Sequence, residues 1–147
     1  MLAEVETDMT IFHRRLADVP TSGDVTDDAL VAIVRDAFYS PDDLTTERVQ
    51  RTAGWLRRWS ARAREDGRPD DVRRAAMNAV NPKYVARNYL AQVAIDAAEQ
   101  GDVSKLHELQ DVLRHPYDEQ PGRESYAEKR PEWARHRAGC SMLSCSS

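Results

Sequence analysis

Residues 45–66 read TTERVQRTAGWLRRWSARARED, and this stretch decides the fold class. Its apolar residues recur at spacings of three and four, which is the pattern of one face of an α-helix. A threonine at position 45 or 46 suits the helix start, because its hydroxyl oxygen can accept from a free backbone N–H of the first turn. The sequence therefore predicts a long amphipathic helix whose buried face carries Val49, Ala53, Leu56, Trp59 and Ala63.

Five further segments on either side show helical periodicity together with helix start and stop signals. Their boundaries are set by capping residues at the starts and by proline or glycine near the ends. The first runs from Thr7-Asp8 to just before Pro20, and the second is capped by Thr26 and ends at Ser40-Pro41. The third is short and runs from Asp70-Asp71 to Val80. The fourth comprises residues 84–100, with Asn81 and Pro82 at its start and Gly101 at its end, and the fifth runs from Asp102 to Pro116.

Residues 84–100 carry apolar side chains on most of the helix circumference, so we expect this helix to be buried on most sides and central. Strand patterns are negligible. The sequence predicts an all-α fold of about six helices packed around a central apolar helix, with an irregular C-terminal arm. Residues 1–115 are expected to form the helical domain. Residues 116–147 are expected to be an extended tail, rich in Pro, Ser and Cys, that packs on it through Tyr117, Tyr126 and Trp133.

The length and composition exclude several classes of protein. A chain of 147 residues suits a single domain, and a mean hydropathy of −0.69 without any long apolar run argues against a membrane span. The N-terminal residues lack the basic start and apolar middle of a secretory signal. Two cysteines near the C-terminus cannot form a disulfide framework. We expect a cytoplasmic protein without a membrane partner.

Charge is distributed unevenly along the chain. The net charge is −4, yet residues 1–47 sum to −8 and residues 48–74 sum to +5. Such a block suits either a solvated helix face or a surface for an acidic partner or nucleic acid. Nucleic acid is the less favoured partner, because the chain is acidic overall and carries no recognised nucleic-acid motif. The basic residues of the block are Arg48, Arg51, Arg57, Arg58, Arg62, Arg64, Arg68, Arg73 and Arg74.

Motifs for chemistry are sparse. No glycine-rich phosphate loop is present, and the paired aspartates at 27–28, 42–43 and 70–71 all fall where helices are expected to start, which capping explains. His136, Cys140 and Cys145 are three soft ligands within ten residues, fewer than a structural zinc site needs, so no metal site is expected. Cys145, among serines near the chain end, is expected to be an exposed, redox-responsive thiol. The alternative is a free thiol without function.

Several longer strings resemble the C-terminal signature of the SelO family of selenoprotein O-like protein adenylyltransferases. The strings are NPKYVARNYLAQ at 81–92, AIDAAEQGD at 94–102, LRHPY at 113–117, RPEW at 130–133 and SCSS at 144–147, with DMTIF at 8–12 upstream. The resemblance departs from the family at Ala86, where leucine is usual, and at Cys140, an extra cysteine. It implies a kinase-like enzyme that binds ATP in an inverted orientation and uses magnesium to transfer AMP to Ser, Thr or Tyr hydroxyls of proteins.

In that family the residues that hold ATP and magnesium lie in the kinase-like core, so the resemblance assigns no catalytic, cofactor-binding or metal-binding role to this chain. It implies that the chain is a helical C-terminal region, as a fragment, a split gene or the product of a misassigned start. Its partners are then the kinase-like core and the protein substrates, and it is expected to be inactive alone.

Many eukaryotic members carry selenocysteine where Cys145 stands, which suggests a redox pair with a core cysteine. In this chain Cys140 is the nearest candidate partner. The competing hypothesis is a free-standing helical binding module that uses the Arg48–Arg74 block. Whether the reading frame continues upstream of Met1 into kinase-like sequence would discriminate between the two.

Overall fold

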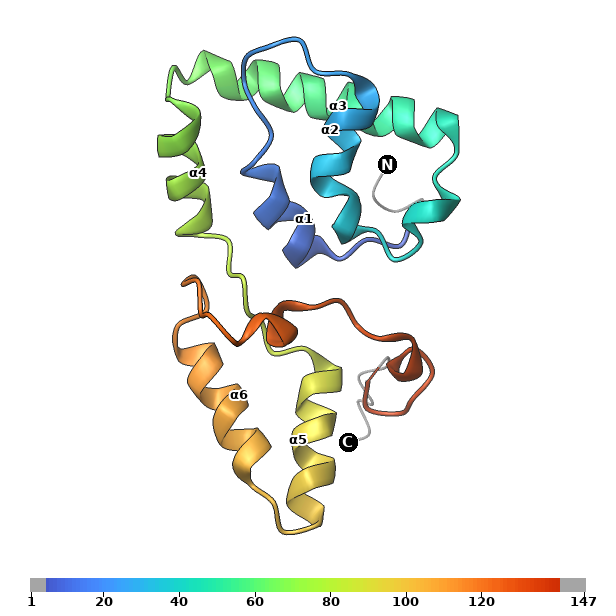
Figure 1. Cartoon of the computed structure of the whole chain (residues 1–147), viewed down its shortest axis with the longest axis vertical. Helices are drawn as coiled ribbons and strands as arrows, with labels where there is room; N and C mark the ends of the chain where they lie inside the picture. The colour runs from blue at the N-terminus through green and yellow to red at the C-terminus, as the bar shows by residue number, and fades with distance from the viewer. Residues whose placement is uncertain (1–4, 141–147) are drawn as a thin grey trace, which may run out of the picture. The chain divides into compact units, whose positions relative to one another are not determined.

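The computed structural model describes residues 5–140, which fold into α-helices and short 3-10 turns with one isolated β-bridge between Thr7 and Phe38. The predicted all-α class is confirmed. The chain divides into two compact units, Met1–Pro82 and Lys83–Ser147, and each is described by itself. Figure 1 shows α1 to α4 in the first unit and α5 and α6 in the second. Among the described residues, no helix is both long and apolar enough to cross a membrane.

The first unit is built from four helices: α1 (Met9–Leu16), α2 (Asp27–Val34), α3 (Thr46–Glu65) and α4 (Asp70–Asn78). The predicted starts of α1, α2 and α3 are confirmed, since side-chain oxygens of Asp8, Thr26 and Thr45 accept from backbone N–H groups three residues further on. The 3-10 turns η2 (Arg35–Ala37) and η3 (Pro41–Asp43) join α2 to α3. The core between α1, α2, η2 and α3 contains Phe12, Leu16, Val19, Leu30, Val31, Val34, Ala37, Phe38, Ala53 and Leu56.

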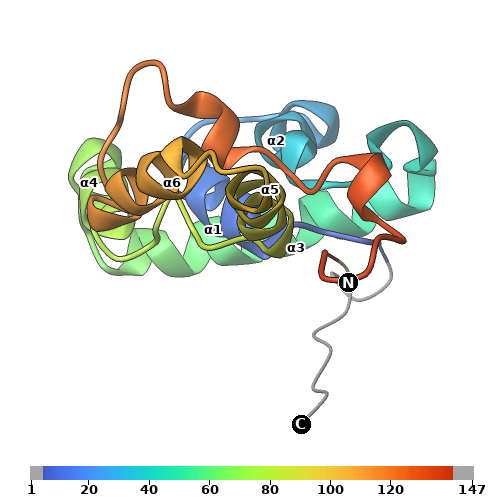
Figure 2. The same ribbon diagram turned by 90° about the horizontal axis from the view of Figure 1, so that it is seen from below.

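The second unit is a hairpin of α5 (Asn88–Glu99) and α6 (Ser104–Arg114), which lie side by side in Figures 1 and 2. Gly101, with φ of +86°, makes the turn between them, as predicted for a glycine after a helix end. The carbonyl oxygen of Pro116 accepts from the backbone N–H groups of Lys83 (2.7 Å) and Tyr84 (3.1 Å). The residues before α5 and after α6 are therefore joined.

This closure corrects the prediction that residues 84–100 form one helix started by Asn81 and Pro82. The helix begins at Asn88, because the amides of Lys83 and Tyr84 donate to Pro116 and the backbone between them and α5 is not helical. The amide of Asn81 instead donates to the Met77 carbonyl (2.9 Å) and closes the end of α4. A tertiary hydrogen bond has overridden a local start signal.

The expectation that this helix is central and buried on most sides is also wrong for the described chain. On α5 only Tyr89 and Ala94 are buried, whereas Val93 is 38% exposed and Ile95 is 50% exposed. Apolar residues on several faces of this helix therefore do not mean that the helix is buried, because apolar side chains are common on protein surfaces.

The C-terminal arm wraps the hairpin through two 3-10 turns, η4 (Glu124–Ala127) and η5 (Glu132–Ala134). The Tyr126 hydroxyl donates to the Glu108 carboxylate on α6 (2.7 Å), and the Trp133 ring meets the Tyr89 ring edge-on at 6.3 Å. Tyr117 is 45% exposed. The division between the two compact units falls after Pro82, whereas the sequence placed a boundary after residue 115, because Pro116 and the arm contact α5, α6 and the residues leading into α5.

Candidate functional site

The redox candidate Cys140 lies at the end of the C-terminal arm against α5. Its thiol is a free, buried side chain, 5% exposed, packed with Tyr89 and Ala134 and bordered by Leu90. Its backbone N–H donates to the Arg137 carbonyl (3.1 Å). Its predicted partner, Cys145, lies outside the described residues.

Arg137 fastens this arm to α5. Its Nη2 atom donates to both carboxylate oxygens of Asp96, at 2.9 and 2.7 Å, so the contact is a charge-assisted hydrogen bond shared between the two oxygens. The amide of Gln92 donates to Asp96 (2.9 Å), and this bond, followed by the Arg137 contact, holds the pKa of Asp96 below its ordinary value. The carboxylate is thus kept ionised as the receptor for the arginine.

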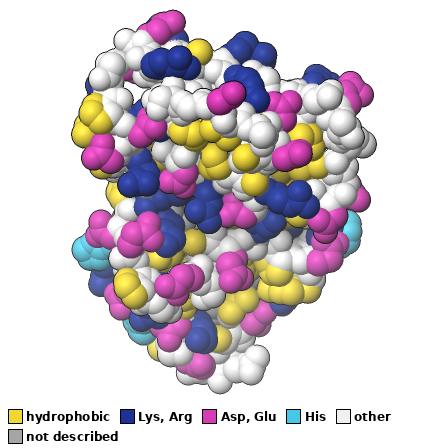
Figure 3. Space-filling model, turned by 45° about the horizontal axis from the view of Figure 1, so that its top comes forward, with side chains coloured by type: hydrophobic (Ala, Val, Ile, Leu, Met, Phe, Trp, Pro, Cys, Tyr) yellow, Lys and Arg dark blue, Asp and Glu magenta, His cyan; other side chains and the backbone are white. Residues whose placement is uncertain are grey.

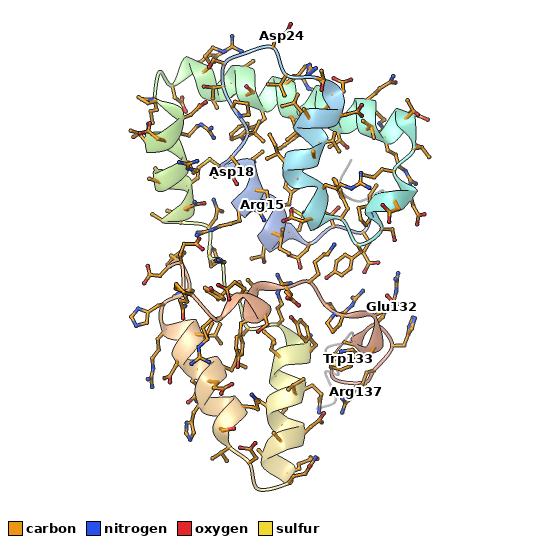
Figure 4. All side chains as sticks on the ribbon, viewed as in Figure 1. Arg15, Asp18, Asp24, Glu132, Trp133 and Arg137 are labelled. Atoms are coloured by element: carbon orange, nitrogen blue, oxygen red, sulfur yellow. The ribbon has the colours of Figure 1, made fainter. Side chains whose placement is uncertain are left out.

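Two aromatic rings reinforce the attachment. The Tyr89 hydroxyl donates to the Glu128 carbonyl (3.0 Å), and the Arg137 guanidinium lies 5.7 Å from the centroid of the Trp133 ring. Figure 4 shows Trp133 and Arg137 on the arm beside α5. We call the set of Tyr89, Asp96, Trp133 and Arg137 the arm clasp.

Gly139 allows the arm to cross α5 closely. Its φ is +82°, and a Cβ atom placed there would lie 2.4 Å from Oε1 of Gln92, the residue that also holds Asp96. Sequence reasoning did not find the arm clasp or this crossing, because none of the contacting pairs is adjacent in sequence or arranged in a motif.

The first unit has a second polar cluster, around Arg73. This arginine is 7% exposed, donates to the Val19 carbonyl (2.7 Å) and lies 4.9 Å from the Trp59 ring centroid. The Asp70 carboxylate beside it accepts from the hydroxyl of Thr21, which chiefly lowers the pKa of Asp70. The solvated interpretation of the basic block is therefore wrong for Arg73. Asp70 is the first residue of α4 and not its cap, which is Pro69.

Most of the remaining arginines of the block are exposed on α3 and after it. Arg57 donates to the Val25 carbonyl (2.9 Å) and pairs with Asp27 (2.6 Å), and Arg62 pairs with Glu65. Figure 3 shows basic and acidic side chains interleaved over the visible face, so positive charge is not segregated there.

A hollow of about 570 Å³ lies beside α1, α2 and η2. Its two arginines are matched by carboxylates, since Arg15 contacts Asp36 at 2.7 Å and Arg35 contacts Asp42 at 2.8 Å. Arg15 and Asp18 are labelled in Figure 4.

The described residues contain no group of three or more His, Cys, Asp or Glu side chains able to hold a metal ion. The resemblance places magnesium in the kinase-like core, so no metal-dependent step is assigned to these residues.

The chain is similar in sequence to several known proteins, although no family model matches it. Proteins named protein nucleotidyltransferase YdiU are 56% identical in Rhodopirellula baltica, 52% in Aromatoleum aromaticum and 54% in Xanthomonas axonopodis pv. citri. Each alignment covers 100% of this chain and 27–29% of the relative's length.

These relatives are named as protein nucleotidyltransferases. Over its whole length the chain is homologous to the C-terminal part of the SelO family proteins that carry the name YdiU. The resemblance found in the sequence is thereby confirmed.

Proposed function

We propose that this chain serves as the C-terminal helical region of a protein adenylyltransferase, an enzyme that transfers AMP from ATP to Ser, Thr or Tyr hydroxyls of proteins. The observation that supports this is the identity of 52–56% over the full chain with proteins named nucleotidyltransferases. Because the chain spans under a third of the relatives' length, the nucleotide and magnesium are proposed to bind in the part of those proteins that it does not cover.

The described residues are proposed to contribute structure and not chemistry. Phosphate binding needs a nest of backbone N–H groups or a placed lysine, and magnesium needs oxygen ligands held together. The sequence carries no motif for the former, and the described side chains offer no cluster for the latter. The chain alone is therefore expected to transfer no AMP.

The test uses labelled ATP, magnesium and a generic protein acceptor. One arm contains this chain alone, a second contains the Aromatoleum aromaticum relative truncated before the matching region, and a third combines the two. We expect label on the acceptor only in the third arm, and none when an unrelated helical protein replaces the chain. Magnesium-dependent labelling by the chain alone would overturn the proposal, as would a soluble truncated relative that labels equally well without it.

We also propose that Cys140 and Cys145 form a reversible disulfide. Two thiols would lose two protons and two electrons to a peroxide, which is reduced to water, and one S–S bond would form. Four residues separate the two cysteines, and bridging needs Cα atoms within about 7 Å. The buried position of Cys140 means that its thiol must leave the contact with Tyr89 and Ala134 to react.

Mass spectrometry after alkylation tests the pair. Peroxide treatment should remove the mass of two hydrogens from the peptide that contains both cysteines, and a thiol reductant should restore it. The Cys140→Ser variant should show no such loss. Equal alkylation of both thiols before and after peroxide would refute the redox pair while leaving the transferase proposal intact.

A further inference from the structure

The guanidinium of Arg73 is buried with few oxygen acceptors around it. The residue is 7% exposed, and its Nη2 atom donates to the Val19 carbonyl (2.7 Å) and lies 3.3 Å from Oδ1 of Asp70. Its Nε atom is buried and has no hydrogen-bond partner among the described residues. A buried donor without an acceptor costs free energy, because it has lost water without a replacement.

The third nitrogen of this guanidinium, Nη1, meets a methionine. Met77 follows Arg73 by four residues on α4, so the two side chains share one face of the helix. The Sδ atom of Met77 lies 3.6 Å from Nη1. A thioether sulfur is only a weak acceptor. Of the three nitrogens, therefore, only Nη2 has an oxygen acceptor within the part of the chain that the structure describes.

The surroundings of Met77 allow a small oxidant to enter but keep the contact largely dry. Met77 is partly buried and packs against the core of the first unit. The Trp59 ring lies over the guanidinium, with its centroid 4.9 Å from Cζ of Arg73. In most cores a methionine sulfoxide is disruptive, because its polar oxygen is buried without a donor. Here a charged donor already lies beside the sulfur.

We propose that Met77 is a peroxide-modified residue whose sulfoxide oxygen accepts from Nη1 of Arg73. The Sδ lone pair attacks one oxygen of hydrogen peroxide, so that an S–O bond forms and the O–O bond breaks. The sulfur loses two electrons, the proton on the transferred oxygen passes to the departing hydroxide, and water leaves. An N–H···O bond of about 2.7–3.2 Å is shorter than the separation of Sδ and Nη1, so an oxygen carried by the sulfur can reach the donor. Oxidation then replaces a weak contact by a charge-assisted hydrogen bond.

Met77→Gln imitates the oxidised side chain, because an amide oxygen takes the place of the sulfoxide oxygen. Met77→Leu is the matched control: it keeps the apolar volume, has no acceptor, and leucine and glutamine have similar helix propensities. We expect the midpoint of thermal unfolding of Met77→Gln to equal or exceed that of Met77→Leu. If no donor served the amide, its midpoint would lie lower by about 4 °C or more.

Arg73→Lys tests the donor in both of these chains. Lysine keeps the charge, but its single nitrogen cannot occupy the positions of Nη1 and Nη2 at once. The exchange should therefore lower the unfolding midpoint more in the Met77→Gln chain than in the Met77→Leu chain. The difference between the two losses measures the coupling between positions 73 and 77.

Peroxide treatment of the full chain, followed by peptide mass spectrometry, tests the modification itself. We expect one added oxygen on Met77. The treatment should lower the unfolding midpoint of the unsubstituted chain no more than that of Met77→Leu, which reports on the other methionines and the cysteines.

Four results would overturn the proposal. They are a lower midpoint for Met77→Gln than for Met77→Leu, equal losses from Arg73→Lys in the two chains, a larger loss on oxidation in the unsubstituted chain than in Met77→Leu, and a Met77 that stays unmodified while Met9, which is 45% exposed, is fully oxidised. None of these results bears on AMP transfer, so failure here is distinguishable from failure of the proposed function.

Discussion

Thr21 is joined to Asp70 across 49 residues of sequence: its hydroxyl donates to Oδ1 at 2.6 Å, and its backbone N–H reaches the same carboxylate at 3.2–3.3 Å. The threonine is 8% exposed. The pair ties the segment after α1 to the first residue of α4, and thereby sets where Arg73 lies.

Thr21→Val should destabilise the first unit in a pH-dependent way. The hydrogen bonds lower the pKa of Asp70 in the folded state, so the stability they contribute is present above its unfolded value and is lost as pH falls through the folded value. We expect a loss of about 1 kcal/mol at pH 7 that shrinks towards pH 3, measured by urea denaturation.

Arg73→Ala should be the more damaging change, because it removes the donor to the Val19 carbonyl and one of the donors to the Asp70 carboxylate, and it uncovers the Trp59 ring. The expected loss in the free energy of unfolding is about 2–4 kcal/mol. Arg74→Ala, at an exposed position, should stay within about 0.5 kcal/mol. If thermal unfolding gave similar losses in the free energy of unfolding for the two variants, the contacts of Arg73 would not stabilise the first unit more than an exposed arginine does.

Gly139→Ala tests the close crossing of the arm over α5. Gly122 is a matched control, because it has the same φ of +82° but nothing within 4 Å of a Cβ atom. Both alanines carry the strain of a positive φ, so the excess cost at position 139 measures the displacement of Gln92 from Asp96. We expect that excess to be about 1 kcal/mol, one hydrogen bond.

Combining Gly139→Ala with Gln92→Ala should remove this excess, since no side-chain amide remains to be displaced. The free energies of unfolding of the single and double variants give the coupling directly. Additive losses would contradict the crossing as described.

Arg137→Ala should expose Cys140. Without the charge-assisted contact to Asp96, the arm should open from α5 more often, and alkylation of the buried thiol should accelerate about threefold or more. Arg114→Ala removes an exposed pair with Asp111 on α6 and should leave the alkylation rate unchanged. An unaltered rate in Arg137→Ala would show that the arm clasp does not protect the thiol.

The local signals in the sequence were sufficient for the starts of α1, α2 and α3. Asp8, Thr26 and Thr45 each cap a helix through a contact three residues away, which a sequence displays directly. The same reasoning fails for residues 81–87, because the group that holds the amides of Lys83 and Tyr84 outside the helix is the carbonyl of Pro116, more than thirty residues further on.

The candidate site was predictable only in part. The thiol at position 140 was visible in the sequence, but its burial depends on Tyr89, which lies on another element. The basic block was equally visible, yet nothing in it distinguishes Arg73, which is buried, from Arg74, which is exposed. A pairing such as Arg137 with Asp96 leaves no periodic trace, because it joins an irregular arm to a helix.

The double acceptance by the Pro116 carbonyl has a consequence for how this part of the chain tolerates changes in length. Residues 83–116 form a loop closed at its base, and Gly101 is at the tip, with open space around it. Residues inserted at that tip lengthen the turn without disturbing either the base or the register of the helices, and closure entropy rises only slowly with loop length. Insertions between homologues are therefore expected to accumulate around Gly101 and to be rare next to Lys83 and Pro116.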